Sequence, residues 1–172
     1  MNEDFVIENK VAKSGLITID LEKIAGDFTV KELDLKQFLY MELLLKEKDF
    51  REALSQHDWT QYTDCVLAVH CSTDAIIASW AYMLVVTHAA GYAKDIVSGS
   101  PQEVYKTMYL SALNQHDWTQ YERKRIIIKG CSDRSIPAAA YAYATRRLIP
   151  VADRIMYGEA CSFVPVWRKP RS

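Results

Sequence analysis

The chain has 172 residues, of which 49% are hydrophobic and 25% charged, and its formal net charge is −1. This length and balance predict a globular protein with a real core, and the near-zero charge excludes a general attraction to nucleic acid or anionic membranes. We therefore expect neither as a partner. The first residues are acidic and contain no apolar run, which predicts no secretory signal.

The longest apolar stretch, residues 75–90, is interrupted by Ser79, Thr87 and His88. It is too short to cross a bilayer, so we expect a cytoplasmic protein that spans no membrane. In a reducing compartment, cysteines are more often free, catalytic or metal-bound than paired in disulfides. The 4 cysteines of this chain are expected to follow that rule.

The N-terminal part, residues 1–55, predicts two strands followed by a helix. Residues 16–20 alternate between apolar and polar side chains, as an edge strand does. Residues 29–35 are a second candidate strand. Residues 37–56 carry leucines and phenylalanines at helical spacing and predict a helix that leads into the next part of the chain.

An internal repeat follows. The segment Gln56–Tyr62 (QHDWTQY) recurs letter for letter as Gln115–Tyr121, 59 residues later. Each copy precedes an apolar strand, a Cys-Ser dipeptide, a helix and a second strand that ends near a glycine. We interpret this pattern as an internal duplication of a β-α-β unit, with units at about 56–100 and 115–162. For the His-Asp-Trp motif itself we expect a structural role: a helix end, a cap by the aspartate and a packed indole.

The remaining elements alternate between strand and helix. The predicted strands are 65–70, 94–98, 125–129 and 154–157, and the predicted helices are 74–90, 101–114 and 135–149. This order is typical of a parallel sheet with right-handed crossovers. We predict an α/β protein with a single domain over residues 1–172, a mostly parallel sheet and helices on both faces. The basic tail, residues 167–171, is expected to fray.

Three cysteines stand where strands end. Cys71 and Cys131 lie between a strand and a helix, and Cys161 lies just beyond another strand. Parallel strands bring their carboxyl ends to one edge of a sheet, so we expect these thiols to converge there. The nearby helix starts favour the thiolate form. Three thiolates and a fourth group suit tetrahedral zinc, which we prefer, or an iron–sulfur cluster.

The fourth metal ligand, or a group that supports it, is predicted among Asp74, Asp133, His70, Glu159 and water. His70 is adjacent to a cysteine in its strand and should point to the opposite face, so the two aspartates rank above it. Both aspartates could instead cap helices. Cys65 lies within a strand and is expected to be a small core residue.

Two other functions remain open from the sequence. The chain could be an enzyme with a cysteine nucleophile, Cys71 or Cys131, activated by a helix start, with His70 as the one obvious base. Alternatively, it could be a non-catalytic interaction protein with structural cysteines. Formation of a homo-oligomer is compatible with either reading.

Four segments of the chain resemble a bacterial family called domain of unknown function 2480: Asn9–Asp20, Leu45–Arg51, Ile128–Ser132 and Ile155–Ser162. The resemblance extends over nearly the whole chain. It implies a cytoplasmic role near iron–sulfur cluster assembly, with assembly proteins as partners. It also matches Cys71, Cys131 and Cys161 to the Cys-Ser positions of the family, but it implies no activity.

Overall fold

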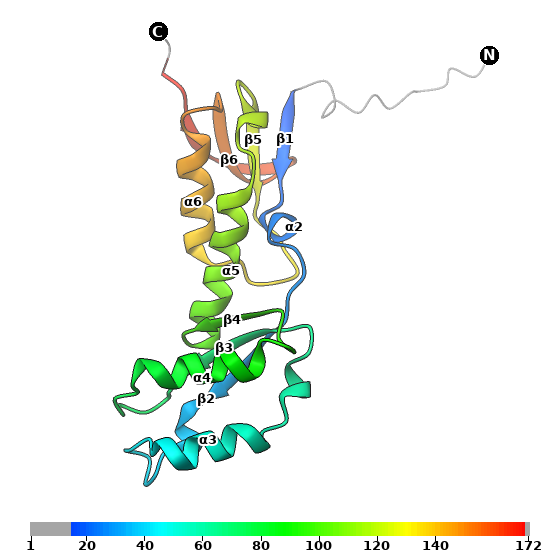
Figure 1. The fold of residues 1–172 in the computed structure, drawn as a ribbon. Coiled ribbons are helices and arrows are strands. Elements are labelled where there is room, and N and C mark those ends of the chain that lie inside the picture. The colour runs from blue at the N-terminus through cyan, green and yellow to red at the C-terminus, as the bar shows by residue number, and fades with distance from the viewer. Residues whose placement is uncertain (1–14, 171–172) are drawn as a thin grey trace, which may run out of the picture. The chain divides into compact units, whose positions relative to one another are not determined.

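The computed structural model describes residues 15–170 and shows an α/β protein (Figure 1). The predicted fold class is therefore confirmed. The first 14 residues, which belong to the predicted N-terminal part, lie outside this description. The elements follow in this order: β1 (Leu16–Ile19), α2 (Leu21–Ala25), β2 (Val30–Asp34), η1 (Leu35–Phe38), α3 (Glu47–Gln56), η2 (Trp59–Tyr62), β3 (Val66–His70), α4 (Ser79–Ala89), β4 (Asp95–Ser98), α5 (Pro101–Gln115), η3 (Thr119–Tyr121), β5 (Arg125–Lys129), α6 (Ala138–Leu148), β6 (Arg154–Glu159) and β7 (Ser162–Arg168).

The strands form two sheets rather than one. Sheet A has the order β1-β5-β6-β7, with β7 antiparallel to its neighbour, and sheet B has the parallel order β2-β3-β4. The contacts divide the chain in the same way, into unit 1 (residues up to Gly26 and from Met108 onward) and unit 2 (Asp27–Thr107). The prediction of a single mostly parallel sheet is wrong, because alternation of strands and helices does not say which strands pair. Here β1 pairs with β5, far along the chain.

The two units place residues that are 59 positions apart at equivalent sites. In sheet B, Val66 is paired with Asp95; in sheet A, Arg125 is paired with Arg154. Helices α4 and α6 begin and end with the same separation. An origin of this correspondence by duplication stays a prediction.

The correspondence changes the interpretation of the Cys-Ser repeat. Cys71 and Cys131 are 60 residues apart, one more than the strands that precede them. The position equivalent to Cys71 is therefore Gly130, and Cys131 lies one residue farther into its loop. The apparent repeat of the thiol is not a repeat of its place in the fold.

The repeated heptapeptide has the structural role that its sequence predicts. In each copy the indole N–H donates to a carbonyl in the last turn of the preceding helix, from Trp59 to Leu54 and from Trp118 to Leu113, at 2.9 Å in both. Those carbonyls have no partner within their own helices, so the buried indoles complete the helix ends. Burial also lowers the pKa of His57 in the first copy.

The core of unit 2 shows how each sheet is covered. Helices α3 and α4 place Phe50, Leu54 and Val85 in one buried cluster with Leu67 and Val69 of β3. In unit 1, α6 lies beside the strands of sheet A (Figure 1) and buries Ala140, Ala144 and Leu148. Small residues on this stripe of α6 let the helix approach the sheet closely.

Two local predictions are wrong. The predicted helix 37–56 begins only at Glu47, since Met41 and Glu42 adopt positive φ angles of 51° and 59°, which no right-handed helix contains. The tail does not fray before Arg168 but forms most of β7, an edge strand that no alternation announced. Over residues 15–170, helices long and apolar enough to cross a bilayer do not occur.

Candidate functional site

The three predicted cysteine ligands do not come together. Cys71 belongs to unit 2 and is half-buried, whereas Cys131 and Cys161 are exposed in unit 1. Within residues 15–170, no group of three or more His, Cys, Asp or Glu side chains is placed to hold a metal ion. The predicted three-cysteine site for zinc or an iron–sulfur cluster is therefore wrong, and so is the metal-binding function. It assumed one sheet, but the strands before Cys71 and Cys131 end in different sheets.

The candidates for the fourth ligand also have other surroundings. His70 lies 3.2 Å from Glu32 through Nε2 and Oε2, and Asp74 and Asp133 are exposed. Neither aspartate caps a helix, because α4 and α6 begin after Ala78 and Pro137 without a side-chain cap.

The remaining cysteine is a core residue, as predicted. Cys65 is 3% exposed, and its thiol donates to the carbonyl oxygen of Tyr62 at 3.0 Å. Burial raises the pKa of this thiol, which opposes the thiolate form. The alternative of a cysteine nucleophile at Cys71 or Cys131 is a prediction that these contacts do not test.

Charged groups do meet at the carboxyl end of β1 and β5. Asp20 Oδ2 accepts a hydrogen bond from Lys129 Nζ at 3.0 Å, and Asp20 Oδ1 caps α2 through the amides of Glu22 and Lys23. Burial alone would raise the pKa of Asp20, but these bonds outweigh it and hold the pKa below its usual value. Most of this charge is thus engaged within the protein; the exception is Glu159 Oε1, a buried oxygen with no hydrogen-bond partner among the described residues.

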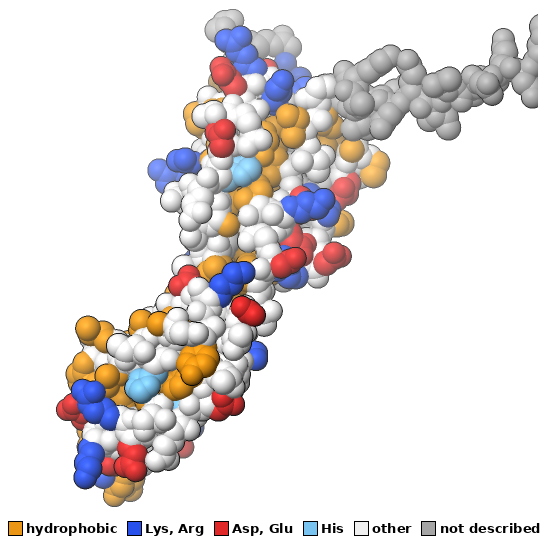
Figure 2. Space-filling view, turned by 45° about the vertical axis from the view of Figure 1, so that its right-hand side comes forward, with side chains coloured by type: hydrophobic (Ala, Val, Ile, Leu, Met, Phe, Trp, Pro, Cys, Tyr) orange, Lys and Arg blue, Asp and Glu red, His pale blue; other side chains and the backbone are white. Residues whose placement is uncertain are grey.

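The opposite end of sheet A carries a row of three arginines. Arg125 of β5 is paired with Arg154 of β6, which is paired in turn with Arg168 of β7. Directly paired residues on neighbouring strands point to the same face and lie about 5 Å apart at Cβ. We call these residues the arginine row. Figure 2 shows Lys and Arg side chains gathered at the end of unit 1 where β5 and β6 begin.

The positive charge of the arginine row is not neutralised within the described residues. None of the ion pairs found over residues 15–170 involves Arg125, Arg154 or Arg168. The row lines an open cavity of about 420 Å³ together with Asp153, Lys169 and Pro170. Four cations thus face one carboxylate. Like charges directly opposite on a sheet destabilise it, so the row costs stability unless an anion binds there.

The fold does not need this row. The equivalents of Arg125 and Arg154 in sheet B are Val66 and Asp95, which are paired in the same register. The same arrangement of strands therefore forms with one apolar and one acidic residue at these positions. The arginines are a property of unit 1 alone, which favours a functional reason for them.

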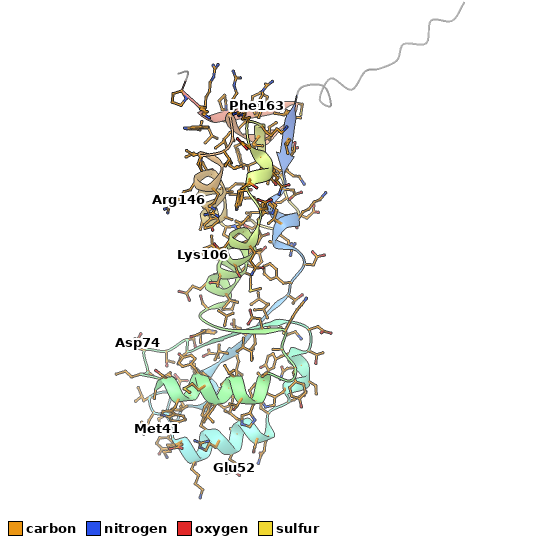
Figure 3. All side chains as sticks on the ribbon, turned by 45° about the horizontal axis from the view of Figure 1, so that its top comes forward. Met41, Glu52, Asp74, Lys106, Arg146 and Phe163 are labelled. Atoms are coloured by element: carbon orange, nitrogen blue, oxygen red, sulfur yellow. The ribbon has the colours of Figure 1, made fainter. Side chains whose placement is uncertain are left out.

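A second cavity adjoins the arginine row. Its volume is about 390 Å³, and it shares all three arginines with the first cavity. The rest of its lining is apolar and comes from β6 and β7: Ile155, Met156, Phe163, Pro165, Val166 and Trp167. Figure 3 labels Phe163 on β7. Cations on one side and aromatic rings on the other suit an anion that carries an apolar group.

Sequence reasoning missed this site, although a signal was present. Arg125 and Arg154 each open a strand, and Arg168 closes the basic tail. Their alignment depends on β7 turning back to pair with β6, which the sequence did not indicate. A net charge of −1 also conceals a local excess of positive charge.

Comparison with known proteins finds a family but no activity. The family model described as "Protein of unknown function (DUF2480)" matches residues 5–169, which include all strands of both sheets. No curated protein matches the chain, and no solved structure does.

Proposed function

Because the chain belongs to the DUF2480 family, which is of unknown function, we propose a function from the site alone: the protein binds polyanionic, phosphate-bearing ligands through Arg125, Arg154 and Arg168. The observation that carries this proposal is the row itself, three arginines in register without a carboxylate partner among the described residues. A bound phosphate would replace the repulsion among them by attraction.

The chemistry of the side chains favours phosphate. A guanidinium group offers parallel N–H donors that match two oxygens of a phosphate, and such charge-assisted bonds are about twice as strong as neutral ones. The three groups stand on paired strands rather than on loops, so their spacing is fixed before a ligand arrives. Lys169 adds a further cation to the cavity. The expectation that nucleic acid is not a partner came from net charge and does not apply to this local surface.

The experiment measures binding of inorganic tripolyphosphate to the full chain by calorimetry at several NaCl concentrations. Arg154→Gln removes the central member of the row and is expected to weaken binding about tenfold, the loss of one good charge-assisted contact. Its matched control is Arg146→Gln, which removes an exposed arginine from α6 (Figure 3) and should leave binding unchanged. Affinity should also fall with salt, less steeply in the Arg154 variant.

Two results would contradict the proposal. The first is no detectable binding of tripolyphosphate at low salt. The second is an equal loss of affinity in Arg154→Gln and Arg146→Gln, which would show that binding follows net charge rather than the arginine row.

A second candidate function, self-association, has an observation of its own. Helix α4 contains no Asp, Glu, Lys or Arg, although part of it faces solvent. Ile76 is 96% exposed, Met83 67% and Val86 43%. Figure 2 shows hydrophobic side chains exposed on unit 2. The residues 59 positions later are Ser135, Ala142 and Thr145, so the fold forms without an apolar surface here.

We propose that this uncharged surface of α4 pairs with a second copy of the chain. A two-fold interface brings a surface against itself, so a lack of charge avoids repulsion between like groups. Met83→Glu should shift the protein toward monomer in sedimentation experiments, whereas Ala142→Glu at the equivalent site of α6 should not. A monomer at all concentrations would contradict self-association; the iron–sulfur assembly proteins that the family resemblance implies would then be the partners to test.

A further inference from the structure

We propose that the phosphate-bearing ligand is a nucleotide, with its base in the apolar cavity beside the arginine row. This inference rests on the proposed function and names the class of ligand. The two cavities have Arg125, Arg154 and Arg168 in common, so a phosphate held by the row lies next to the apolar lining. A nucleoside phosphate has the same two parts in the same order.

The lining of this cavity suits a flat aromatic group. Trp167 and Phe163 supply two aromatic rings, and Met156 supplies a polarisable side chain. Stacking on such rings is favourable for every base, because each base has a π face. No carboxylate lines this cavity, so nothing in it repels a nucleotide.

The apolar side chains of β7 are unusually exposed for a strand that packs in a sheet. Phe163 is 42% exposed, Val164 63% and Val166 51%. Inorganic phosphate would leave this surface in water, whereas a base would cover Phe163 and Val166. The exposed apolar area beside the row therefore distinguishes an organic phosphate from a simple anion.

The strand pairing fixes the cavity before a ligand binds. Gly158 stands opposite Phe163, and a Cβ atom at Gly158 would lie 2.6 Å from the carbonyl oxygen of Ser162 and 3.1 Å from Cα of Phe163. The two strands thus approach as closely as their backbones allow. A register shift near Ile155 and Met156 marks an irregularity, and such bulges re-aim the side chains beside them, here those of Val166 and Trp167.

The test compares two probes of similar charge on the full chain, inorganic tripolyphosphate and ATP, both in EDTA. Wild type should bind ATP about tenfold more tightly, the contribution of one stacked base. Trp167→Leu should abolish that preference and leave the affinity for tripolyphosphate within twofold. Phe163→Ala is the second variant, in case the first does not fold by circular dichroism. Arg154→Gln should weaken both probes.

The outcomes separate this inference from the proposed function. Equal affinity of wild type for ATP and tripolyphosphate, or an unchanged preference in both β7 variants, would overturn the nucleotide site while the anion site stands. Failure of tripolyphosphate to bind would overturn the proposed function itself. Tighter binding of a twelve-nucleotide single strand than of ATP would identify the source of the base and phosphate as nucleic acid. Binding to phosphatidylglycerol vesicles but not to ATP would overturn the inference in favour of a lipid.

Discussion

Arg154→Gln should make the free protein more stable, although it removes a partly buried side chain. Arg154 is the central member of the arginine row, with Arg125 on one side and Arg168 on the other. Glutamine keeps much of the aliphatic stem and removes the charge. The variant therefore isolates the repulsion that the row causes.

The size of the effect follows from the spacing of the strands. Two guanidinium charges about 6 Å apart in water repel each other by about 0.7 kcal/mol, so the two neighbours of Arg154 contribute about 1.4 kcal/mol without salt. At 0.15 M salt the screening length is about 8 Å, and the repulsion falls to about half. We expect the free energy of unfolding to rise by about 1 kcal/mol at low salt and by less at 0.15 M.

Urea unfolding followed by circular dichroism measures this difference at 10 mM and at 500 mM NaCl. Arg146→Gln is the control, because Arg146 lies in the last turn of α6, where a cation is stabilising. The same change of net charge should therefore lower the free energy of unfolding there. Tripolyphosphate at about 100 times its Kd should stabilise wild type by about 2.7 kcal/mol and the Arg154 variant by much less.

The reasoning is refuted if Arg154→Gln is less stable than wild type at 10 mM NaCl. It is also refuted if the difference does not depend on salt, because repulsion between exposed charges must be screened. A gain of equal size in both arginine variants would point to net charge instead of the local row.

Three further outcomes are expected. Trp59→Phe and Trp118→Phe should each lower the free energy of unfolding by about 1–3 kcal/mol, since a helix-end carbonyl loses its buried donor; urea unfolding measures both, and a loss in only one would show that the two motif copies differ. Asp20→Asn keeps the helix cap but loses the charge that Lys129 contacts. The pKa of Asp20 is low in the folded state, so wild type should be the more stable above about pH 5, and the difference should vanish as the pH falls through that pKa; a difference that persists at pH 2 would contradict this account. Cys131→Ser should change stability by less than about 0.5 kcal/mol, because the side chain is exposed, and a larger loss in thermal unfolding would reveal a contact of the thiol.

The sequence by itself determined the local elements of this protein. Runs of β-branched residues predicted β3 and β5 within one residue, because a short apolar run bounded by polar residues is a local signal. The capping pattern at Ser100 predicted the start of α5, and its carboxylate contact with Glu103 is present at 2.8 Å. The repeated heptapeptide likewise predicted two similar helix ends.

Only the tertiary structure decided which strands pair, and the functional sites depend on pairing. The cysteines were predicted to converge because all parallel strands were assigned to one sheet, and the division into two sheets separates Cys71 from Cys131. Conversely, Arg125, Arg154 and Arg168 become neighbours only when β7 turns back along β6. Apolar patterning specifies that a strand is buried but not beside which partner, since many pairings bury the same side chains. A site built from residues on several strands is therefore written in the sequence only as separate parts.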